Sequence, residues 1–294
     1  MRAIRLLPLL GLVLALAGCG GGGEPAAERD PTPVPEGGPF AFDRDADLDV
    51  AEGETSQEPQ FTAKALSYAS PGGDRVSGIV VVPKGEPRPA GVVFMHGAGG
   101  SRIDFLADAA QLAKAGAVTL TIDSPFSRSE SEPIRAGAAP PETIRELMIQ
   151  NAQDLVRGLD VLVREYDADP ARLGVVGYSM GVQAAATAAA LDGRPKAVVL
   201  IAGRANPSRT PGDAAWERLF RSIDTVHFLP DLAPAAVLVQ GGKRDRVIPR
   251  AELEELYAAT SRPKEIRWYD TGHALSRQAG RDRVAWLSTT LGLK

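Results

Sequence analysis

One pentapeptide constrains this chain more than any other stretch of its sequence. Residues 177–181 read Gly-Tyr-Ser-Met-Gly, after the apolar run Leu-Gly-Val-Val and before a helix-forming stretch at 182–191. Between a strand and a helix, Gly-x-Ser-x-Gly forms a sharp turn that exposes the serine hydroxyl at the edge of a sheet. Glycine lets the backbone pass closely where a Cβ atom would collide. The pattern predicts that Ser179 is a nucleophile beside the N–H groups of the following helix. An ordinary turn is the alternative.

Apolar runs and helical periodicities alternate along the rest of the chain. Strands are predicted at residues 61–69, 76–82, 91–95, 117–122, 173–176, 196–202, 236–240 and 265–269, and helices at 103–115, 142–166, 182–191, 251–259 and 278–291. The first two strands flank Ser-Pro-Gly-Gly-Asp, which has the chemistry of a hairpin turn. The alternation predicts an α/β fold, with a mostly parallel sheet of about eight strands, an N-terminal antiparallel hairpin and helices on both faces.

Four candidate residues follow the ends of predicted strands. Ala98, Ser179, Asp245 and His273 each lie just past such a strand. Sheets of this kind bind ligands outside the carboxyl ends of their strands, so the four are expected at one edge. The chain order Ser, Asp, His is the order of the α/β-hydrolase triad.

These motifs together resemble the α/β-hydrolase superfamily over residues 61–294. The resemblance rests on the His-Gly pair at 96–97, the pentapeptide, Gly-x-x-Asp-x-x-x-Pro at 242–249 and Gly-His at 272–273. The hairpin, and a small insertion in place of a large cap, make the chain similar to the dienelactone-hydrolase-like and acyl-peptidase-like branch. Dienelactone hydrolase has a cysteine nucleophile, which this chain lacks, so its substrate is not carried over.

The resemblance implies a serine hydrolase that cleaves small-molecule carboxylic esters through an acyl-enzyme. His273 would take the proton of Ser179, and Asp245 would orient the imidazole. The backbone N–H groups of Met180 and Ala98 would bind the oxyanion, each such donor being worth about 3 kcal/mol of barrier. A peptidase, a thioesterase or an acyltransferase could use the same triad. A non-catalytic binding lipoprotein is the alternative from another class.

Other residues compete for these roles. Asp270 and Asp123 are rivals of Asp245 for the acid. His96 is expected to shape the oxyanion loop through a hydrogen bond, and His227 to be a surface histidine or to touch substrate. A polar loop at 126–141 and an insertion at 204–230 are expected to wall the pocket. The candidate pocket residues are Tyr178, Phe126, Trp216 and Phe220, with local packing as the alternative.

The first 60 residues read as export and tethering segments. Residues 1–18 combine a basic start with an apolar run too short to span a bilayer. They end in Leu-Ala-Gly-Cys, which resembles the lipobox of bacterial lipoproteins and implies a lipid anchor on Cys19; an ordinary secretory signal is the alternative. Residues 19–60 are rich in Gly, Pro, Ala and acidic side chains and are predicted to be a flexible tether, unless Phe40 and Phe42 dock on the domain. The domain is therefore expected outside the cytoplasm, anchored to a membrane.

Composition excludes several classes of protein. The 294 residues, 44% of them hydrophobic, suit one domain at 61–294. The net charge is −4 and the basic residues are scattered, which argues against a nucleic-acid partner. A single cysteine excludes an internal disulfide. No His-x-His or His-Glu-x-x-His spacing occurs, so neither a metal nor another cofactor is expected.

Overall fold

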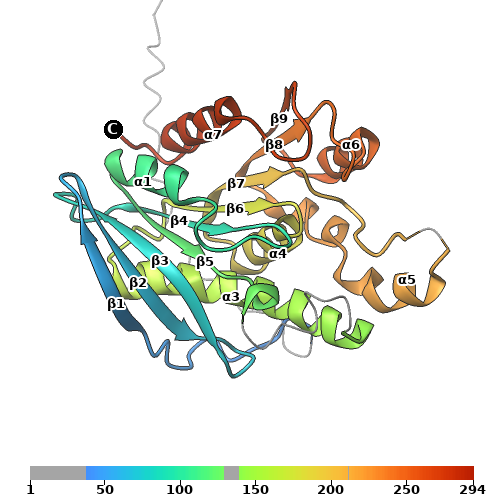
Figure 1. The fold of residues 1–294 in the computed structure, drawn as a ribbon, viewed down its shortest axis with the longest axis horizontal. Coiled ribbons are helices and arrows are strands. Elements are labelled where there is room, and N and C mark those ends of the chain that lie inside the picture. Colours follow the sequence, from blue (N-terminus) through green and yellow to red (C-terminus); the bar gives the residue numbers. More distant parts are fainter. Residues whose placement is uncertain (1–37, 129–138, 211) are drawn as a thin grey trace, which may run out of the picture.

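The computed structural model describes residues 38–128, 139–210 and 212–294. Among these residues, nine strands form one sheet in the order β1-β2-β3-β5-β4-β6-β7-β8-β9 (Figure 1). The strands are β1 Ala51–Gln57, β2 Phe61–Ala69, β3 Arg75–Pro83, β4 Ala90–Met95, β5 Ala117–Ile122, β6 Leu173–Tyr178, β7 Pro195–Ile201, β8 Ala236–Gly242 and β9 Lys264–Tyr269. The pairs from β1 to β3, and β3 with β5, are antiparallel. The pairs from β5 through β4 to β9 are parallel.

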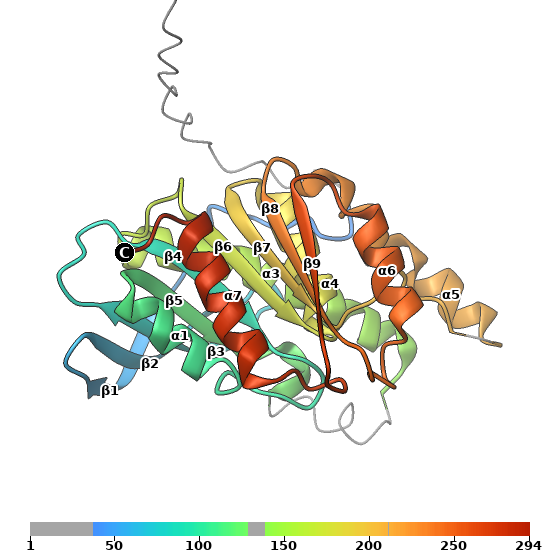
Figure 2. The same cartoon turned by 90° about the horizontal axis from the view of Figure 1, so that it is seen from above.

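Helices cover both faces of the sheet (Figure 2). Helices α1 Leu106–Lys114 and α7 Arg277–Thr290 pack on one face and contribute to one core cluster. Helices α3 Pro141–Glu165, α4 Gly181–Asp192 and α6 Arg250–Ala259 contribute to the larger cluster on the other face. Every residue of β4 and β5 is buried, as expected for strands with helices above and below.

The predicted architecture is confirmed. The five predicted helices and eight predicted strands are present with ends shifted by a few residues, and the hairpin turn closes with Ser70 N–H donating to the Asp74 carbonyl at 3.0 Å. The insertion at 204–230 is small and holds α5 Ala214–Phe220 with short 3-10 turns. The parallel strands point their carboxyl ends to one edge of the sheet, which is the edge that carries the predicted site.

The ninth strand corrects the predicted boundary of the tether. Residues 38–60 belong to the folded domain, because β1 pairs with β2 at the edge of the sheet. Phe40 and Leu48 are buried in the larger core cluster, with Phe40 edge-on to Phe228 at 5.3 Å between ring centroids. Phe42 is partly buried against the same cluster. The docking alternative is therefore correct for this segment, and the domain begins before residue 61.

Two arginines hold the N-terminal segment on the domain, the buried Arg157 and the partly buried Arg44. Arg157 of α3 donates to three backbone carbonyls of this segment, those of Arg44, Ala46 and Asp47, at 2.7–2.9 Å. In the opposite direction, Arg44 of the N-terminal segment forms ion pairs with Asp160 of α3 and Asp192 of α4. Guanidinium groups suit this arrangement because their N–H donors diverge in a fixed fork.

We expect Phe40→Ala to destabilise the domain by about 3–5 kcal/mol, since the side chain is almost fully buried and a cavity would remain. Phe42→Ala, at a half-buried position, is the matched control and should cost less. Urea unfolding followed by tryptophan fluorescence measures both. A free energy of unfolding for Phe40→Ala within 0.5 kcal/mol of wild type, on the order of a surface change, would show that the segment adheres only loosely.

The predicted signal segment, residues 1–18, lies outside the described residues, as do residues 19–37 of the predicted tether, Cys19 among them. Of the helices in the described part of the chain, none is both long and apolar enough to cross a membrane.

Candidate active site

The pentapeptide forms a strained turn between β6 and α4. Ser179 has φ of 54°, in the left-handed region that a side chain other than glycine seldom adopts. Its N–H donates to the Ile201 carbonyl at 2.8 Å, and its carbonyl accepts from Val182 N–H at 3.0 Å. These bonds fix the serine between the end of β7 and the first turn of α4. Such strain persists only where the surroundings enforce it, and it collects at functional sites.

Backbone crowding explains the two glycines of the pentapeptide. A Cβ atom on Gly177 would lie 2.3 Å from the Gly181 carbonyl oxygen, and one on Gly181 would lie 2.6 Å from the His96 carbonyl oxygen. The turn thus packs on itself and on the loop that follows β4. This second contact brings Ser179 beside the predicted oxyanion loop.

Ser179, His273 and Asp245 form one continuous hydrogen-bonded chain. His273 follows β9, and its Nε2 lies 2.9 Å from Ser179 Oγ. Its Nδ1 lies 2.8 Å from Asp245 Oδ2, just past β8. The Asp245 side chain is 4% exposed, against 20% for His273. The carboxylate therefore lies deeper in the protein than the imidazole.

The Asp245 carboxylate is held in place by its own loop. Its Oδ1 accepts the backbone N–H groups of Val247 at 2.8 Å and Ile248 at 3.0 Å, which leaves Oδ2 for the imidazole. A carboxylate fixed this way presents a defined acceptor and sets which ring nitrogen carries the proton. In this arrangement His273 Nδ1 donates to Asp245 and Nε2 faces the serine.

Neither rival carboxylate occupies this position. Asp270 is exposed and pairs with Arg244 at 2.7 Å. Asp123 forms an ion pair with Arg102, and its Oδ1 accepts Arg102 N–H at 2.7 Å. Asp123 thus fastens the loop after β4 instead of the imidazole.

The predicted oxyanion loop, residues 96–100, is braced by hydrogen bonds. His96 is buried; its Nε2 accepts Ser124 N–H at 3.0 Å, so its Nδ1 carries the proton and donates to the Gly97 carbonyl at 2.7 Å. Ser127 Oγ, in the 3-10 turn η1 Pro125–Ser127, donates to the Gly100 carbonyl at 2.8 Å. The structural role predicted for His96 is confirmed, whereas the bracing by Ser124 and Ser127 leaves no sequence signal.

The two predicted oxyanion donors lie on the segments that meet at Ser179. Met180 directly precedes α4, and Ala98 lies in the braced loop. The segments touch, because a Cβ atom on Gly97 would lie 3.0 Å from the Ser179 Cβ. The role of the Met180 and Ala98 N–H groups as oxyanion donors stays a prediction.

Tyr178 supports the imidazole from the side. Its ring lies 5.2 Å from the His273 ring between centroids, and its hydroxyl donates to the His273 carbonyl at 3.3 Å. Burial, with smaller contributions from the Asp245 and Asp104 charges, raises the pKa of Tyr178, so the phenol stays protonated. Tyr178 lines a separate cavity of about 180 Å³ beside the start of α7.

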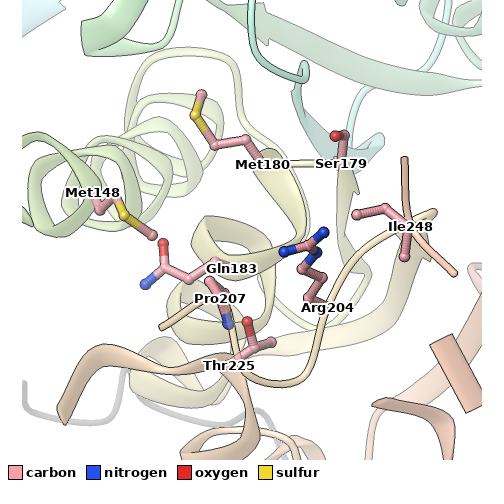
Figure 3. Close-up of a pocket in the computed structure, with 8 residues that line it drawn as sticks. All are labelled: Met148, Ser179, Met180, Gln183, Arg204, Pro207, Thr225 and Ile248. Carbon is pink, nitrogen blue, oxygen red and sulfur yellow. The ribbon is translucent and has the colours of Figure 1, made fainter. Parts of the chain in front are cut away.

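A cavity of about 190 Å³ opens beside Ser179 (Figure 3). Apolar and polar side chains line it: Met148, Met180, Gln183, Arg204, Pro207, Thr225 and Ile248, together with Ser179. They come from α3, α4, the 204–230 insertion and the loop after Asp245. The insertion therefore does wall this cavity, through residues that carried no individual signal in the sequence.

The predicted aromatic pocket residues do not line this cavity. Trp216 stacks on Phe220 at 3.9 Å between centroids, and Phe220 is buried in the core. Phe126 packs against the same core cluster. Local packing, the alternative for these side chains, accounts for all three. His227 is exposed, and its Nε2 lies 2.8 Å from the Arg221 carbonyl oxygen.

Within the described residues, no group of three or more His, Cys, Asp and Glu side chains is arranged to hold a metal ion.

The sequence profile described as the dienelactone hydrolase family matches residues 76–286, which include the whole hydrogen-bonded chain. This chain belongs to the dienelactone hydrolase family. No curated protein matches the chain in sequence.

Solved structures of esterases share the fold. The acetyl xylan esterase of Paenibacillus sp. R4 is 21% identical with a TM-score of 0.68, over 83% of this chain and 89% of that one. Acetyl xylan esterase 1 of Thermoanaerobacterium sp. JW/SL YS485 is 18% identical with a TM-score of 0.69, over 86% and 91%. A cold-adapted esterase from an Arctic intertidal metagenomic library is 18% identical with a TM-score of 0.64, over 82% and 98%. At these identities the likeness concerns the α/β-hydrolase fold.

Proposed function

We propose that the protein is a serine hydrolase of carboxylic esters. The observation that carries the proposal is the unbroken chain from Asp245 through His273 to Ser179, with both links under 3 Å. A serine hydroxyl is a poor nucleophile until an adjacent base removes its proton. Family membership and the esterases that share the fold support the same chemistry.

Acylation follows from these positions. His273 Nε2 takes the Ser179 proton as Oγ bonds to the ester carbonyl carbon, and the carbonyl electron pair moves onto its oxygen. Main-chain N–H groups of Met180 and Ala98 stabilise that oxyanion. Asp245 stabilises the imidazolium. The oxyanion then collapses, the bond to the alkoxy oxygen breaks, and His273 Nε2 returns the proton to the departing alcohol.

Deacylation repeats the sequence with water. His273 removes a proton from water as its oxygen bonds to the acyl carbon. The tetrahedral intermediate breaks the bond to Ser179 Oγ, which regains the proton, and a carboxylic acid leaves.

Two assays on the full chain test this proposal. The first is hydrolysis of p-nitrophenyl esters from acetate to palmitate, and the second is labelling by a fluorophosphonate located by mass spectrometry. We expect ester turnover and one adduct on Ser179. An adduct on Ser179 without ester turnover would keep the serine nucleophile and indicate that the substrates are amides or thioesters. If neither occurred, the non-catalytic alternative would replace the hydrolase.

We further propose that Cys19 carries a lipid anchor that holds the domain outside the cytoplasm. The support is the short apolar run ahead of the chain's single cysteine. In a bacterial host, the wild type should partition into the detergent phase of Triton X-114 and Cys19→Ala into the aqueous phase. Equal partitioning of the two proteins would refute the anchor.

A further inference from the structure

The cavity beside Ser179 lies on the acyl side of the site. Its lining includes Ser179 and Met180, which would hold the acyl carbon and the oxyanion, but it does not include His273. A departing alcohol must lie against His273 Nε2 to receive its proton, so it leaves by another side. This assignment, like the whole inference, rests on the proposed ester hydrolysis.

The far side of the cavity carries an unpaired hydroxyl. Thr225, in the 3-10 turn η4 Thr225–His227, is fully buried, and its Oγ1 has no hydrogen-bond partner among the described residues. Figure 3 shows Thr225 across the cavity from Ser179. Buried hydroxyls are nearly always paired, because an unmet one costs about 1–3 kcal/mol. An acyl chain that supplies a partner would therefore be favoured.

Gln183 adds an acceptor to the same lining. Its Nε2 donates to the Ile223 carbonyl at 3.2 Å, and this bond fixes the orientation of the amide. The amide oxygen Oε1 is then left as a hydrogen-bond acceptor. The side chain is almost fully buried in the first turns of α4. The cavity thus has an amide oxygen that can accept a hydrogen bond from a ligand.

Arg204 adds donors without a net charge. Its Nε lies 2.8 Å from Glu252 Oε2, and its Nη2 donates to the Val247 carbonyl at 3.2 Å. The guanidinium has five N–H donors, so others remain for the cavity that the side chain lines. Because Glu252 balances the charge, the lining is polar but close to neutral.

We propose that the site selects esters of short hydroxyacyl groups. A hydroxyl both donates and accepts, so it can meet the Gln183 amide oxygen, the Thr225 hydroxyl and the Arg204 N–H donors. A carboxylate would face the Gln183 acceptor and a guanidinium already paired with Glu252. A plain alkyl chain would leave Thr225 unpaired. The cavity of about 190 Å³ holds roughly six water-sized groups, which suits a chain of about four carbons.

The test compares p-nitrophenyl 3-hydroxybutyrate with p-nitrophenyl butyrate on the full chain. We expect kcat/KM for the hydroxy ester, in one enantiomer, to exceed that for butyrate at least tenfold. Thr225→Val keeps the side-chain shape and removes the hydroxyl, and it should lower that ratio at least fivefold. Thr187→Val is the matched control, because Thr187 is also buried with an unpaired hydroxyl but lies on α4 away from the cavity lining. It should keep the wild-type ratio.

Each other outcome contradicts the proposal. A wild type that prefers butyrate has an apolar acyl site. A preference for the p-nitrophenyl hemiester of succinic acid over both identifies an anion site around Arg204. A ratio that Thr225→Val leaves unchanged removes Thr225 from recognition. In these cases ester hydrolysis still stands, whereas inertness toward every ester removes the proposed function as well.

Discussion

Ester hydrolysis by Ser179→Ala is expected to fall about a millionfold in kcat, to the level that binding and oxyanion stabilisation alone sustain. The reason is geometric: Ser179 Oγ lies 2.9 Å from His273 Nε2, and its removal would leave the imidazole without a hydroxyl to activate. Steady-state kinetics with a p-nitrophenyl ester, after active-site titration of the wild type, measure the change.

Companion variants make the result specific. His273→Ala should match Ser179→Ala, and the double variant should be no worse, because the residues act as one unit. Asp245→Asn should cost about ten-thousandfold, since the amide would favour the wrong imidazole tautomer. Asp270→Asn is the matched control: that carboxylate is exposed and pairs with Arg244. Losses of kcat that add independently in the double variant would contradict the idea that Ser179 and His273 act as one unit. A loss of kcat in Asp270→Asn as large as that in Asp245→Asn would assign the acid role to Asp270.

The second large effect is expected from Gly177→Ala, which should prevent stable folding. The new methyl group would lie 2.3 Å from the Gly181 carbonyl oxygen and 2.6 Å from Ala185 Cβ. Both neighbours belong to α4, whose first turns are buried, so neither can move away without displacing the helix. We expect a loss above about 4 kcal/mol, at the severe end of single substitutions.

Gly53→Ala is the control for this change. A Cβ atom on Gly53, in the exposed edge strand β1, meets its nearest neighbour at an ordinary 3.5 Å. Its free energy of unfolding should stay within about 0.5 kcal/mol of wild type. Calorimetry or urea unfolding compares the two. A Gly177→Ala protein that unfolds like the wild type would mean that the turn can open without loss.

Sequence patterns predicted the sheet, its helices and the meeting of the three polar residues because each left a local signal. Buried parallel strands are continuous apolar runs, and parallel ordering brings their carboxyl ends to one edge. Ser179, Asp245 and His273 could therefore be assigned to that edge without any knowledge of their contacts.

The edge strand and the cavity lining had no such signal. Residues of β1 are all exposed and read Ala-Glu-Gly-Glu-Thr-Ser-Gln, so the strand exists through backbone pairing and shows no apolar alternation. Arg204 and Thr225 lie in a segment whose sequence has the composition of an ordinary polar loop. Their place in the lining of the cavity beside Ser179 depends on the tertiary fold. The sequence analysis named the large aromatic residues Trp216 and Phe220 as pocket candidates, but in the structure they stack on each other.

The bracing of the loop after β4 has a consequence for genetics. Asp123, Ser124 and Ser127 reach across to that loop through three separate hydrogen bonds. A saturation screen for esterase activity would therefore score Asp123 and Ser127 as intolerant, because their side chains make these bonds, although both are remote in sequence from Ser179. Ser124 bonds through its backbone N–H, so at that position only proline should be rejected on this ground.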